Sequence, residues 1–249
     1  MELTLLQEML VREELVETAP AGCWRDLADV LNAGVDRVIL FGPPGTGKTY
    51  AALNFATSST GAERLICTED LTTADVTGSW VPVSGGRWEW LEGPAIRSWR
   101  HGSRLVVDEV DRAAGDVLSL LLAVTDTDGS AQWRHPHSGE LIRPHDQFTV
   151  VMTTNLERLE ELPPALRDRF PVAIRIDRPH PSSVAKLSGD LRRAAMNGSL
   201  GGDDRRISLR AFYAFDLLRR HHGSERAAAL VFGPMRDRAF LDTLTISEL

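Results

Sequence analysis

The chain has 249 residues, and 28 lysines and arginines against 35 aspartates and glutamates give it a net charge of −7 at pH 7. Its hydrophobic share of 43% and charged share of 25% are typical of a soluble globular protein. The acidic balance argues against a broad nucleic-acid footprint, although it does not exclude a local basic patch. There is no apolar run of about 18 residues, the length a transmembrane helix needs. The acidic N-terminal segment lacks the basic region of a signal peptide, so we expect a cytoplasmic protein.

The predicted elements begin with two helices. Leucines spaced three to four apart predict a helix over residues 2–17, and a shorter helix is expected at 24–32. Short β-branched runs then alternate with helical segments at 93–101 and 113–124. The expected strands are DRVILF before residue 42, ERLIC (63–67), RLVV (104–107), QFTVVMT (147–153) and VAIRI (172–176).

This alternation predicts an α/β fold, in which a central parallel sheet is covered by helices on both faces. Beyond Pro181 the strand signal disappears and only helical patterns remain. We therefore divide the chain into an N-terminal helical segment (1–34), an α/β core (35–180) and a small, all-helical C-terminal lid (181–249).

Two segments interrupt the rhythm. SWVPVSGGRWEWLE (79–92) alternates around Gly85 and Gly86 and predicts a β-hairpin, and residues 131–147 predict a second one that turns at Ser138 and Gly139. Trp88 and Trp90 are two residues apart on one strand, so they share a face, and packing of that face is favoured over contact with a substrate.

The clearest motif is a phosphate-binding loop. Its pattern, G-x-x-x-x-G-K-[ST], follows the predicted strand DRVILF and opens a helix. Backbone N–H groups in such a loop point at phosphate oxygens, Lys48 supplies a compact positive charge, and Thr49 offers its hydroxyl to Mg²⁺. The motif therefore predicts the core of a P-loop NTPase, which binds a nucleoside triphosphate together with Mg²⁺. The expected nucleotide-binding residues are Gly42, Pro43, Pro44, Gly45, Thr46, Gly47, Lys48, Thr49, Tyr50 and Asp108.

Adjacent acids follow the strand RLVV. Asp108 fits the Walker B role, in which a carboxylate holds Mg²⁺ through its water shell, so Thr49 and Asp108 form the predicted metal site. Glu109 fits the carboxylate that activates the attacking water. Three histidines at 135, 137 and 145 are weak metal candidates, because they fall on a predicted exposed hairpin without cysteine or clustered acid.

Polar residues also follow later segments of the core. Asn155 comes directly after a buried strand and could position water beside the γ-phosphate. Arg167 and Arg169 follow a proline-initiated turn of helix, where a surface arginine pair is an equally good interpretation of the spacing alone.

These motifs together resemble the AAA+ ATPases of the MoxR-like, dynein-related branch, from about residue 35 to the C-terminus. The resemblance rests on GPPGTGKT (42–49), EGPAIRSWRHGSRLVVDEVDRA (92–113), GELIRPHDQFTVVMTTN (139–155) and LRDRF (166–170). It implies that Asn155 is sensor 1 and that Arg169, rather than Arg167, is the arginine finger that reaches a neighbouring subunit. It also implies that Ser208 caps a lid helix whose first turn carries Arg210 as sensor 2.

The resemblance implies a ring-forming ATPase with ATP and Mg²⁺ as cofactors. It also implies a homo-oligomer, most simply a hexamer, that remodels a partner protein. Such family members often work with a protein that bears a von Willebrand factor A domain. Two alternatives remain open, namely the motor subunit of a nucleic-acid-directed restriction or anti-phage system and a nucleotide-binding switch. The acidic main body disfavours the motor, and the set of Asp108, Glu109 and Asn155 disfavours a pure switch.

Overall fold

The computed structural model describes residues 22–57, 60–113, 115–126, 130–136, 138–198, 206–234 and 236–247. The helix predicted at 2–17 lies outside these ranges. The chain divides into two compact units, of which one comprises residues 26–43 and 48–175 and the other residues 1–25, 44–47 and 176–249. We call them the sheet unit and the helical unit, and each is described by itself.

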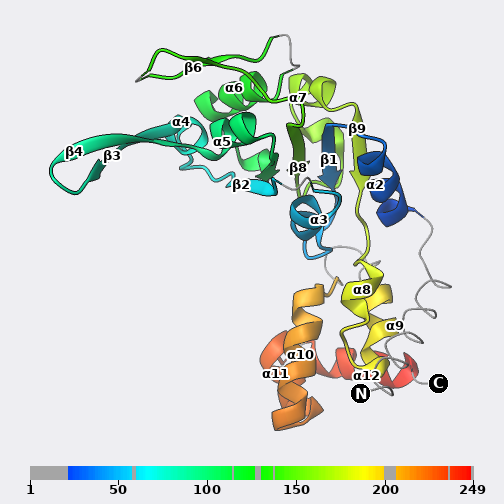
Figure 1. Cartoon of the computed structure of the whole chain (residues 1–249). Helices are drawn as coiled ribbons and strands as arrows, with labels where there is room; N and C mark the ends of the chain where they lie inside the picture. Colours follow the sequence, from blue (N-terminus) through cyan, green and yellow to red (C-terminus); the bar gives the residue numbers. More distant parts are fainter. Residues whose placement is uncertain are drawn as a thin grey trace, which may run out of the picture. The chain divides into compact units, whose positions relative to one another are not determined.

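The sheet unit is built on a five-stranded sheet in which every pair of neighbours is parallel (Figure 1). The strand order is β2-β5-β8-β1-β9. The strands are β1 (Arg37–Phe41), β2 (Ala62–Ile66), β5 (Arg104–Asp108), β8 (Thr149–Thr153) and β9 (Val172–Arg175). The three central strands are buried almost throughout, as expected for a sheet with helices on both faces. The predicted α/β architecture is confirmed.

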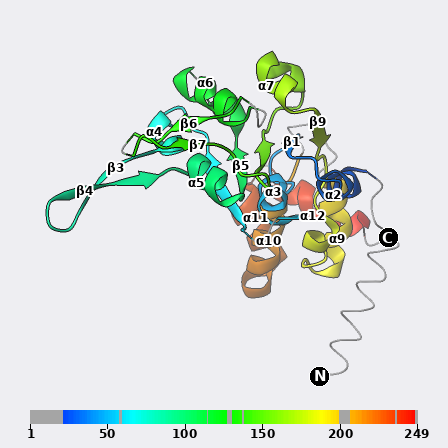
Figure 2. The same cartoon turned by 45° about the horizontal axis from the view of Figure 1, so that its top comes forward.

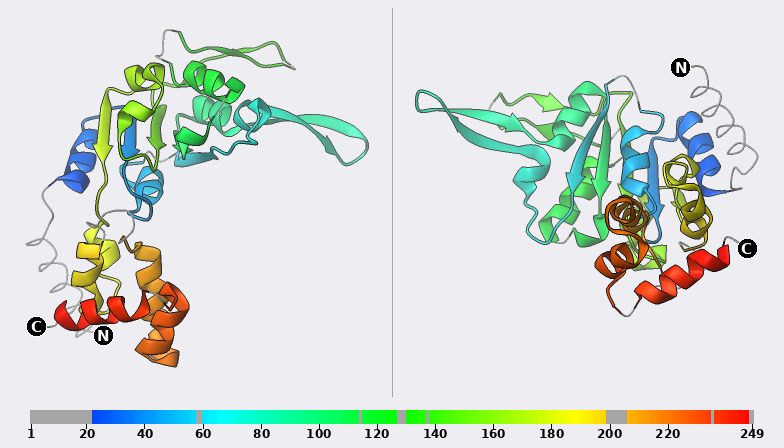
Figure 3. Two further views of the ribbon diagram at one scale, coloured as in Figure 1. Left: turned by 180° about the vertical axis from the view of Figure 1, so that it is seen from behind. Right: turned by 90° about the horizontal axis from the view of Figure 1, so that it is seen from below.

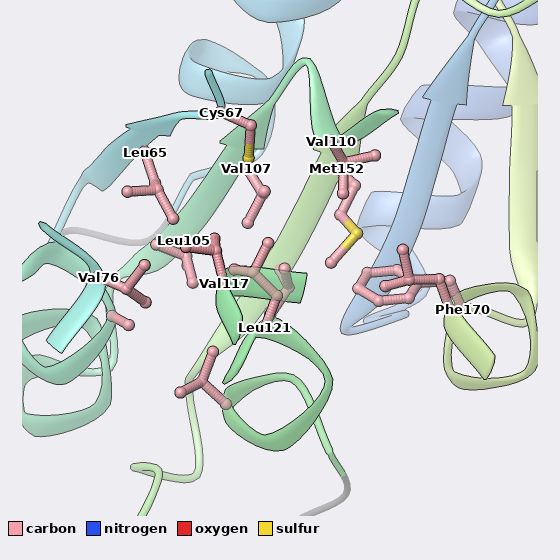
Figure 4. Packing of buried hydrophobic residues seen from close by; sticks show 14 of the residues in the cluster. Leu65, Cys67, Val76, Leu105, Val107, Val110, Val117, Leu121, Met152 and Phe170 are labelled. Carbon is pink, nitrogen blue, oxygen red and sulfur yellow. The ribbon is translucent and has the colours of Figure 1, made fainter. Parts of the chain in front are cut away.

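Helices cover the sheet between these strands. They are α2 (Cys23–Asn32, which crosses the unit boundary), α3 (Lys48–Asn54), α4 (Thr73–Thr77), α5 (Pro94–His101), α6 (Gly115–Val124) and α7 (Pro164–Arg169), with 3-10 turns at Val110–Arg112 and Leu159–Glu161. On one face, Leu105 and Met152 of the sheet pack with Val117 and Leu121 of α6 (Figure 4). These side chains alternate with residues of the opposite face, so each central strand contributes to both apolar layers.

A buried arginine fixes the helix that follows the phosphate-binding loop. Arg104 of β5 donates to the carbonyl oxygens of Ala52 (3.0 Å), Phe55 (2.6 Å) and Ala56 (2.8 Å). Carbonyl groups at a helix C-terminus lack partners within the helix and carry partial negative charge, so a guanidinium group there satisfies and stabilises them. The C-terminal end of α3 is thereby tied to the central strand that carries Asp108.

Both predicted hairpins are present. The long one, β3 (Gly78–Val83) with β4 (Arg87–Glu92), projects away from the sheet (Figures 1 and 2). Two residues of its turn, Gly85 (φ 82°) and Gly86 (φ 71°), have positive φ, a conformation that glycine adopts readily. The second is shorter than expected, because only β6 (Trp133–Arg134) and β7 (Leu141–Ile142) pair.

Tryptophans link the two hairpins. The rings of Trp80 and Trp90 meet edge to face at 5.8 Å, and Trp90 also lies 6.0 Å from Trp133 and 5.7 Å from His135. The prediction that the face shared by Trp88 and Trp90 is packed is therefore confirmed for Trp90. It is wrong for Trp88, which is 62% exposed, because Trp133 and His135 reach only the end of the hairpin that lies near the sheet.

The helical unit contains helices alone between residues 176 and 247, in the part that the structure describes (Figure 3). They are α8 (Pro181–Val184), α9 (Gly189–Gly198), α10 (Leu209–His222), α11 (Ser224–Phe232) and α12 (Asp237–Ser247). Its core is aromatic, with the rings of Phe215 and Phe240 4.9 Å apart. Among the described residues, no helix has the length and apolar character needed to cross a bilayer.

Candidate functional site

The phosphate-binding loop connects β1 to α3. Gly45 (φ 78°) and Gly47 (φ 103°) hold backbone conformations that other residues rarely adopt. Gly45 also lies where a side chain would not fit, since a Cβ atom there would be 2.8 Å from the Cβ of Ser208, in the same unit as residues 44–47. The start of the loop is anchored by the N–H of Gly42, which donates to the carbonyl of Leu156 at 3.0 Å.

Lys48 is buried at the first position of α3. Its ammonium group donates to the carbonyl oxygens of Gly42 (2.8 Å) and Pro43 (2.7 Å), so the side chain curls back along the loop. A buried ammonium group needs such acceptors, because burial of an unpaired charge is costly. The arrangement holds a point charge inside the curve of the loop, which suits an anionic phosphate.

Asp108 ends β5 as a buried carboxylate with three partners. Thr49 donates to its Oδ1 at 2.8 Å, Thr153 also donates to Oδ1, and Arg64 forms an ion pair with Oδ2. Burial raises the pKa of Asp108, but the hydrogen bonds from Thr153, Arg64 and Thr49 outweigh it and leave the pKa below its usual value. Asp108 is therefore ionised at neutral pH and lies against the hydroxyl that was expected to share Mg²⁺ with it.

Glu109 follows with an unusual backbone. It is a non-glycine residue in the left-handed region (φ 57°, ψ 47°), a conformation that costs energy and often occurs at functional sites. Its N–H donates to Thr153 Oγ1 at 3.2 Å, and its Oε2 is 3.0 Å from Arg112 Nε. This ion pair is partly exposed, so it is weak enough for Glu109 to leave.

Asn155 lies half-buried in the loop after β8, and its neighbours tie that loop to the site. Thr154 donates through Oγ1 to Asp111 (2.6 Å) and through its N–H to the carbonyl of Leu40 (3.0 Å). With the bond from Gly42 to Leu156, the ends of β1, β5 and β8 form one connected edge. The carboxyl ends of parallel strands are where α/β sheets bind ligands.

The two arginines that were predicted as finger candidates lie on α7. Arg167 and Arg169 occupy the last turn of α7, and Arg169 pairs with Asp126 at 3.6 Å. Among the described residues, neither arginine forms an ion pair with Asp108 or Glu109. Their assignment as fingers stays a prediction.

Arg210 and Tyr50 are both exposed. Arg210 lies in the first turn of α10, and Ser208 caps that helix as predicted by accepting from the N–H of Ala211 at 3.3 Å. Tyr50 is 61% exposed and meets Phe55 edge to face at 6.5 Å. The roles expected for Arg210 and Tyr50 remain predictions.

Sequence reasoning missed two partners of Asp108, namely Arg64 and Thr153. Thr153 could have been found, since it is a polar residue at the end of the predicted strand QFTVVMT, two positions before Asn155. Arg64 had one weak signal, a charged residue inside the short strand ERLI. Its role depends on strand register, and a single sequence does not provide that register.

The residues present fit a magnesium nucleotide. Thr49 and Asp108 would both offer oxygen atoms to the cation. Mg²⁺ typically keeps several waters and uses one or two carboxylates together with substrate phosphates. Among the described residues, no cluster of three or more histidines, cysteines or acids forms a dedicated metal cage. Lys48 would face the phosphates, and Thr49 and Asp108 would hold the cation.

The chain belongs to the AAA domain family, dynein-related subfamily, whose model matches residues 37–170. An uncharacterized protein of Staphylococcus aureus is 29% identical over 178 residues, which cover 68% of this chain and 64% of that protein. One of Staphylococcus haemolyticus is 31% identical over 147 residues, 56% of this chain and 55% of its own length. The chain thus spans 64% of the length of the first of these relatives.

Among solved structures, NtrX from Brucella abortus is 16% identical, with a TM-score of 0.48, over 100% of this chain and 73% of its own. Family membership identifies the domain as a P-loop AAA domain, a class that binds ATP, typically with Mg²⁺.

Proposed function

We propose that this protein hydrolyses ATP and couples the cycle to remodelling of a partner protein, as a MoxR-like chaperone. One observation carries the proposal: Thr49 donates to the ionised Asp108 at 2.8 Å, next in the chain to the buried ammonium of Lys48. In this proposal Lys48, which would bind phosphate, and Thr49, which would bind the cation, are consecutive in the chain, and Thr49 contacts the second cation ligand, Asp108, at the end of β5.

Each residue has a distinct task in this mechanism. Lys48 and the loop N–H groups bind and orient the β- and γ-phosphates. Thr49 and Asp108 would hold Mg²⁺, which supplies charge neutralisation on those phosphates when it is bound. Glu109 would leave its pair with Arg112 and accept a proton from a water molecule as the water oxygen attacks the γ-phosphorus. The bond between the γ-phosphorus and the bridging oxygen then breaks, and ADP leaves. Asn155 orients that water from the loop that Thr154 anchors.

The remaining site residues would act through assembly. We place Arg169, with Arg167 as the next candidate, on the γ-phosphate of a neighbouring subunit in a head-to-tail ring, most simply a hexamer. The weak contact between Arg169 and Asp126 supports this, because a pair at 3.6 Å between partly exposed side chains costs little to break. Arg210, in the first turn of a capped helix, would sense the nucleotide from the lid.

The partner would meet the β3–β4 hairpin. Trp88 is exposed near its tip, and exposed aromatic side chains are typical of protein contacts. A protein that carries a von Willebrand factor A domain is the partner that the family resemblance suggests.

The variant Glu109→Gln tests the function. It keeps the shape and the Mg²⁺ ligands but cannot accept the proton, so hydrolysis should fall by about 10²–10⁴-fold while ATP affinity stays within about threefold. Phosphate release and equilibrium titration measure the two quantities, with Glu157→Gln as a control on an exposed ion pair of the same unit. Hydrolysis by Glu109→Gln near the wild-type rate would remove this residue as the base.

The same variant would trap an ATP-bound assembly, which sedimentation would reveal as a larger species than the nucleotide-free protein. A monomer under these conditions would contradict the ring.

A further inference from the structure

The Walker B aspartate is paired with an arginine from the neighbouring strand. In the register between β2 and β5, Ile66 lies opposite Asp108 and Arg64 lies opposite Val106. Side chains alternate between faces along a strand, so Arg64 and Asp108 point to the same face, two positions apart. Arg64 Nε lies 3.2 Å from Asp108 Oδ2, and Nη2 donates to the same oxygen.

The two oxygens of Asp108 have different partners. Oδ1 accepts from the hydroxyl groups of Thr49 and Thr153, whereas Oδ2 accepts from Arg64. The side chain of Asp108 is 5% exposed, so its charge is nearly removed from water and needs a counter-charge. Arg64 supplies a full positive charge at Oδ2.

The exposure of the two side chains makes this pairing exchangeable. Arg64 is 42% exposed, so its guanidinium group can move into water at little cost, whereas Asp108 has nowhere to go. A divalent cation that binds the carboxylate of Asp108 would repel the guanidinium group of Arg64. Because the two cations repel each other, they would compete for the negative charge of this one carboxylate.

We propose that Arg64 is a positioning residue for the cation site, which neutralises Asp108 in the absence of metal and is displaced when magnesium nucleotide binds. Displacement takes up part of the binding free energy of Mg²⁺. Mg²⁺ alone therefore binds poorly, whereas Mg²⁺ held by the phosphates of a nucleotide displaces the arginine. The inference rests on the proposed magnesium–nucleotide site, and it adds a reason why the site loads metal and nucleotide together.

The test uses Arg64→Gln in the full chain and measures three quantities by calorimetry. Without nucleotide, the affinity for Mg²⁺ alone should rise by about tenfold, because the competing charge is gone. In the absence of metal the unfolding temperature should fall, because Asp108 loses its counter-charge. At saturating concentrations of Mg²⁺ and ATP, the difference in unfolding temperature between Arg64→Gln and the wild type should become smaller. Arg64→Lys should restore weak Mg²⁺ binding.

Arg97→Gln is the matched control. Arg97 lies on α5 and pairs at 2.7 Å with Glu63, a residue of β2, the strand that also carries Arg64. The side chain of Arg97 is 37% exposed, close to the value for Arg64. The Arg97→Gln substitution removes one positive charge near β2 without removing a partner of Asp108. The affinity of this variant for Mg²⁺ should therefore stay near that of the wild type. An equal rise in both variants would mean a general charge effect and would overturn the inference.

Two failures can be told apart. Wild-type protein that binds no ATP in the presence of Mg²⁺ would contradict the proposed function itself. Wild-type protein that binds ATP normally, with Arg64→Gln showing unchanged or weaker affinity for Mg²⁺ alone, would contradict only the role of Arg64.

Discussion

Two buried aspartates, one in each unit, are held by arginine and hydroxyl groups in closely similar ways. Asp108 in the sheet unit and Asp216 in the helical unit are each 4% exposed. Asp216 accepts from the N–H (3.2 Å) and Oγ (2.7 Å) of Ser188 and pairs with Arg219 (3.0 Å) and Arg220 (2.9 Å).

The arginines that pair with the two aspartates differ in exposure and in their other contacts. Arg219 is 17% exposed, pairs with Asp190 as well, and stacks over Phe215 at 5.5 Å. Arg64 is 42% exposed, and among the described residues Asp108 is the acid it pairs with. The helical unit thus holds its buried charge with one fixed arginine, Arg219, beside the exposed Arg220 (61%), whereas the arginine that pairs with the buried charge of the sheet unit can leave. The difference between the two aspartates is therefore the fixed arginine, which Asp216 has in Arg219 and which Asp108 does not have among the described residues.

The largest expected effect concerns Arg169. Its ion pair with Asp126, at 3.6 Å, is longer than the ion pair between Arg64 and Asp108. Arg169→Ala should lower hydrolysis by about 10³–10⁵-fold, as loss of an arginine finger does in related phosphoryl-transfer sites. Steady-state phosphate release measures this. Arg158→Ala, which removes an arginine with a 78% exposed side chain, should leave the rate unchanged.

Mixing separates a finger that acts in trans from one that acts in cis. Arg169→Ala and Lys48→Ala should each be inactive alone, but mixed subunits should regain activity, because about a quarter of interfaces in a randomly mixed ring would be complete. No recovery after demonstrated subunit exchange would rule out Arg169 as a finger that acts in trans and make Arg167 the next position to test.

Asp216→Asn probes the fixed pairing in the helical unit. The substitution removes the charge and weakens the hydrogen bonds from Ser188 and Arg219, so the free energy of unfolding should fall by about 1.5–3 kcal/mol. Denaturant titration of the full chain measures the change. Glu225→Gln, at an exposed position in the first turn of α11, should stay within about 0.5 kcal/mol of the wild type. A similarly small effect of Asp216→Asn would contradict a stabilising role for the pair.

A smaller effect should appear in acid. Burial raises the pKa of Asp216, but hydrogen bonds from Ser188 and the charge of Arg219 outweigh it and leave the pKa lowered. A carboxyl group with a lowered folded-state pKa stabilises the protein above its unfolded-state pKa, which is about 4, and loses that stabilisation as pH falls further. Unfolding temperature should therefore drop below about pH 4 in the wild type and drop less steeply in Asp216→Asn. Parallel profiles for the two proteins would contradict this linkage.

Much of the site could be predicted because its chemistry is contiguous in the sequence. The phosphate-binding loop and the Asp108–Glu109 pair each occupy a few consecutive residues, and each follows a strand that the apolar pattern marks clearly. The parallel sheet was predictable for the same reason, since β1, β5 and β8 each contain an unbroken apolar run (VILF, LVV and VVM).

The unpredicted features depend on register and on distant packing. Arg64 meets Asp108 only because β2 and β5 pair with Ile66 opposite Asp108. The second hairpin is short, and Trp133 within it packs on Trp90 but leaves Trp88 exposed. Neither arrangement has a local signature, because the partners lie about 40 residues apart in the chain.

The two lysines of this chain, Lys48 and Lys186, provide the most direct test of the nucleotide site. Calorimetric titration with ATP and Mg²⁺ should show about 10–100-fold weaker binding by Lys48→Ala, because a charged hydrogen bond to phosphate contributes about 1.5–3 kcal/mol. Lys186→Ala removes the same charge from an exposed position in the helical unit and should bind as the wild type does. Equal affinity of a folded Lys48→Ala protein and the wild type would contradict the assignment of this loop as the site of ATP binding.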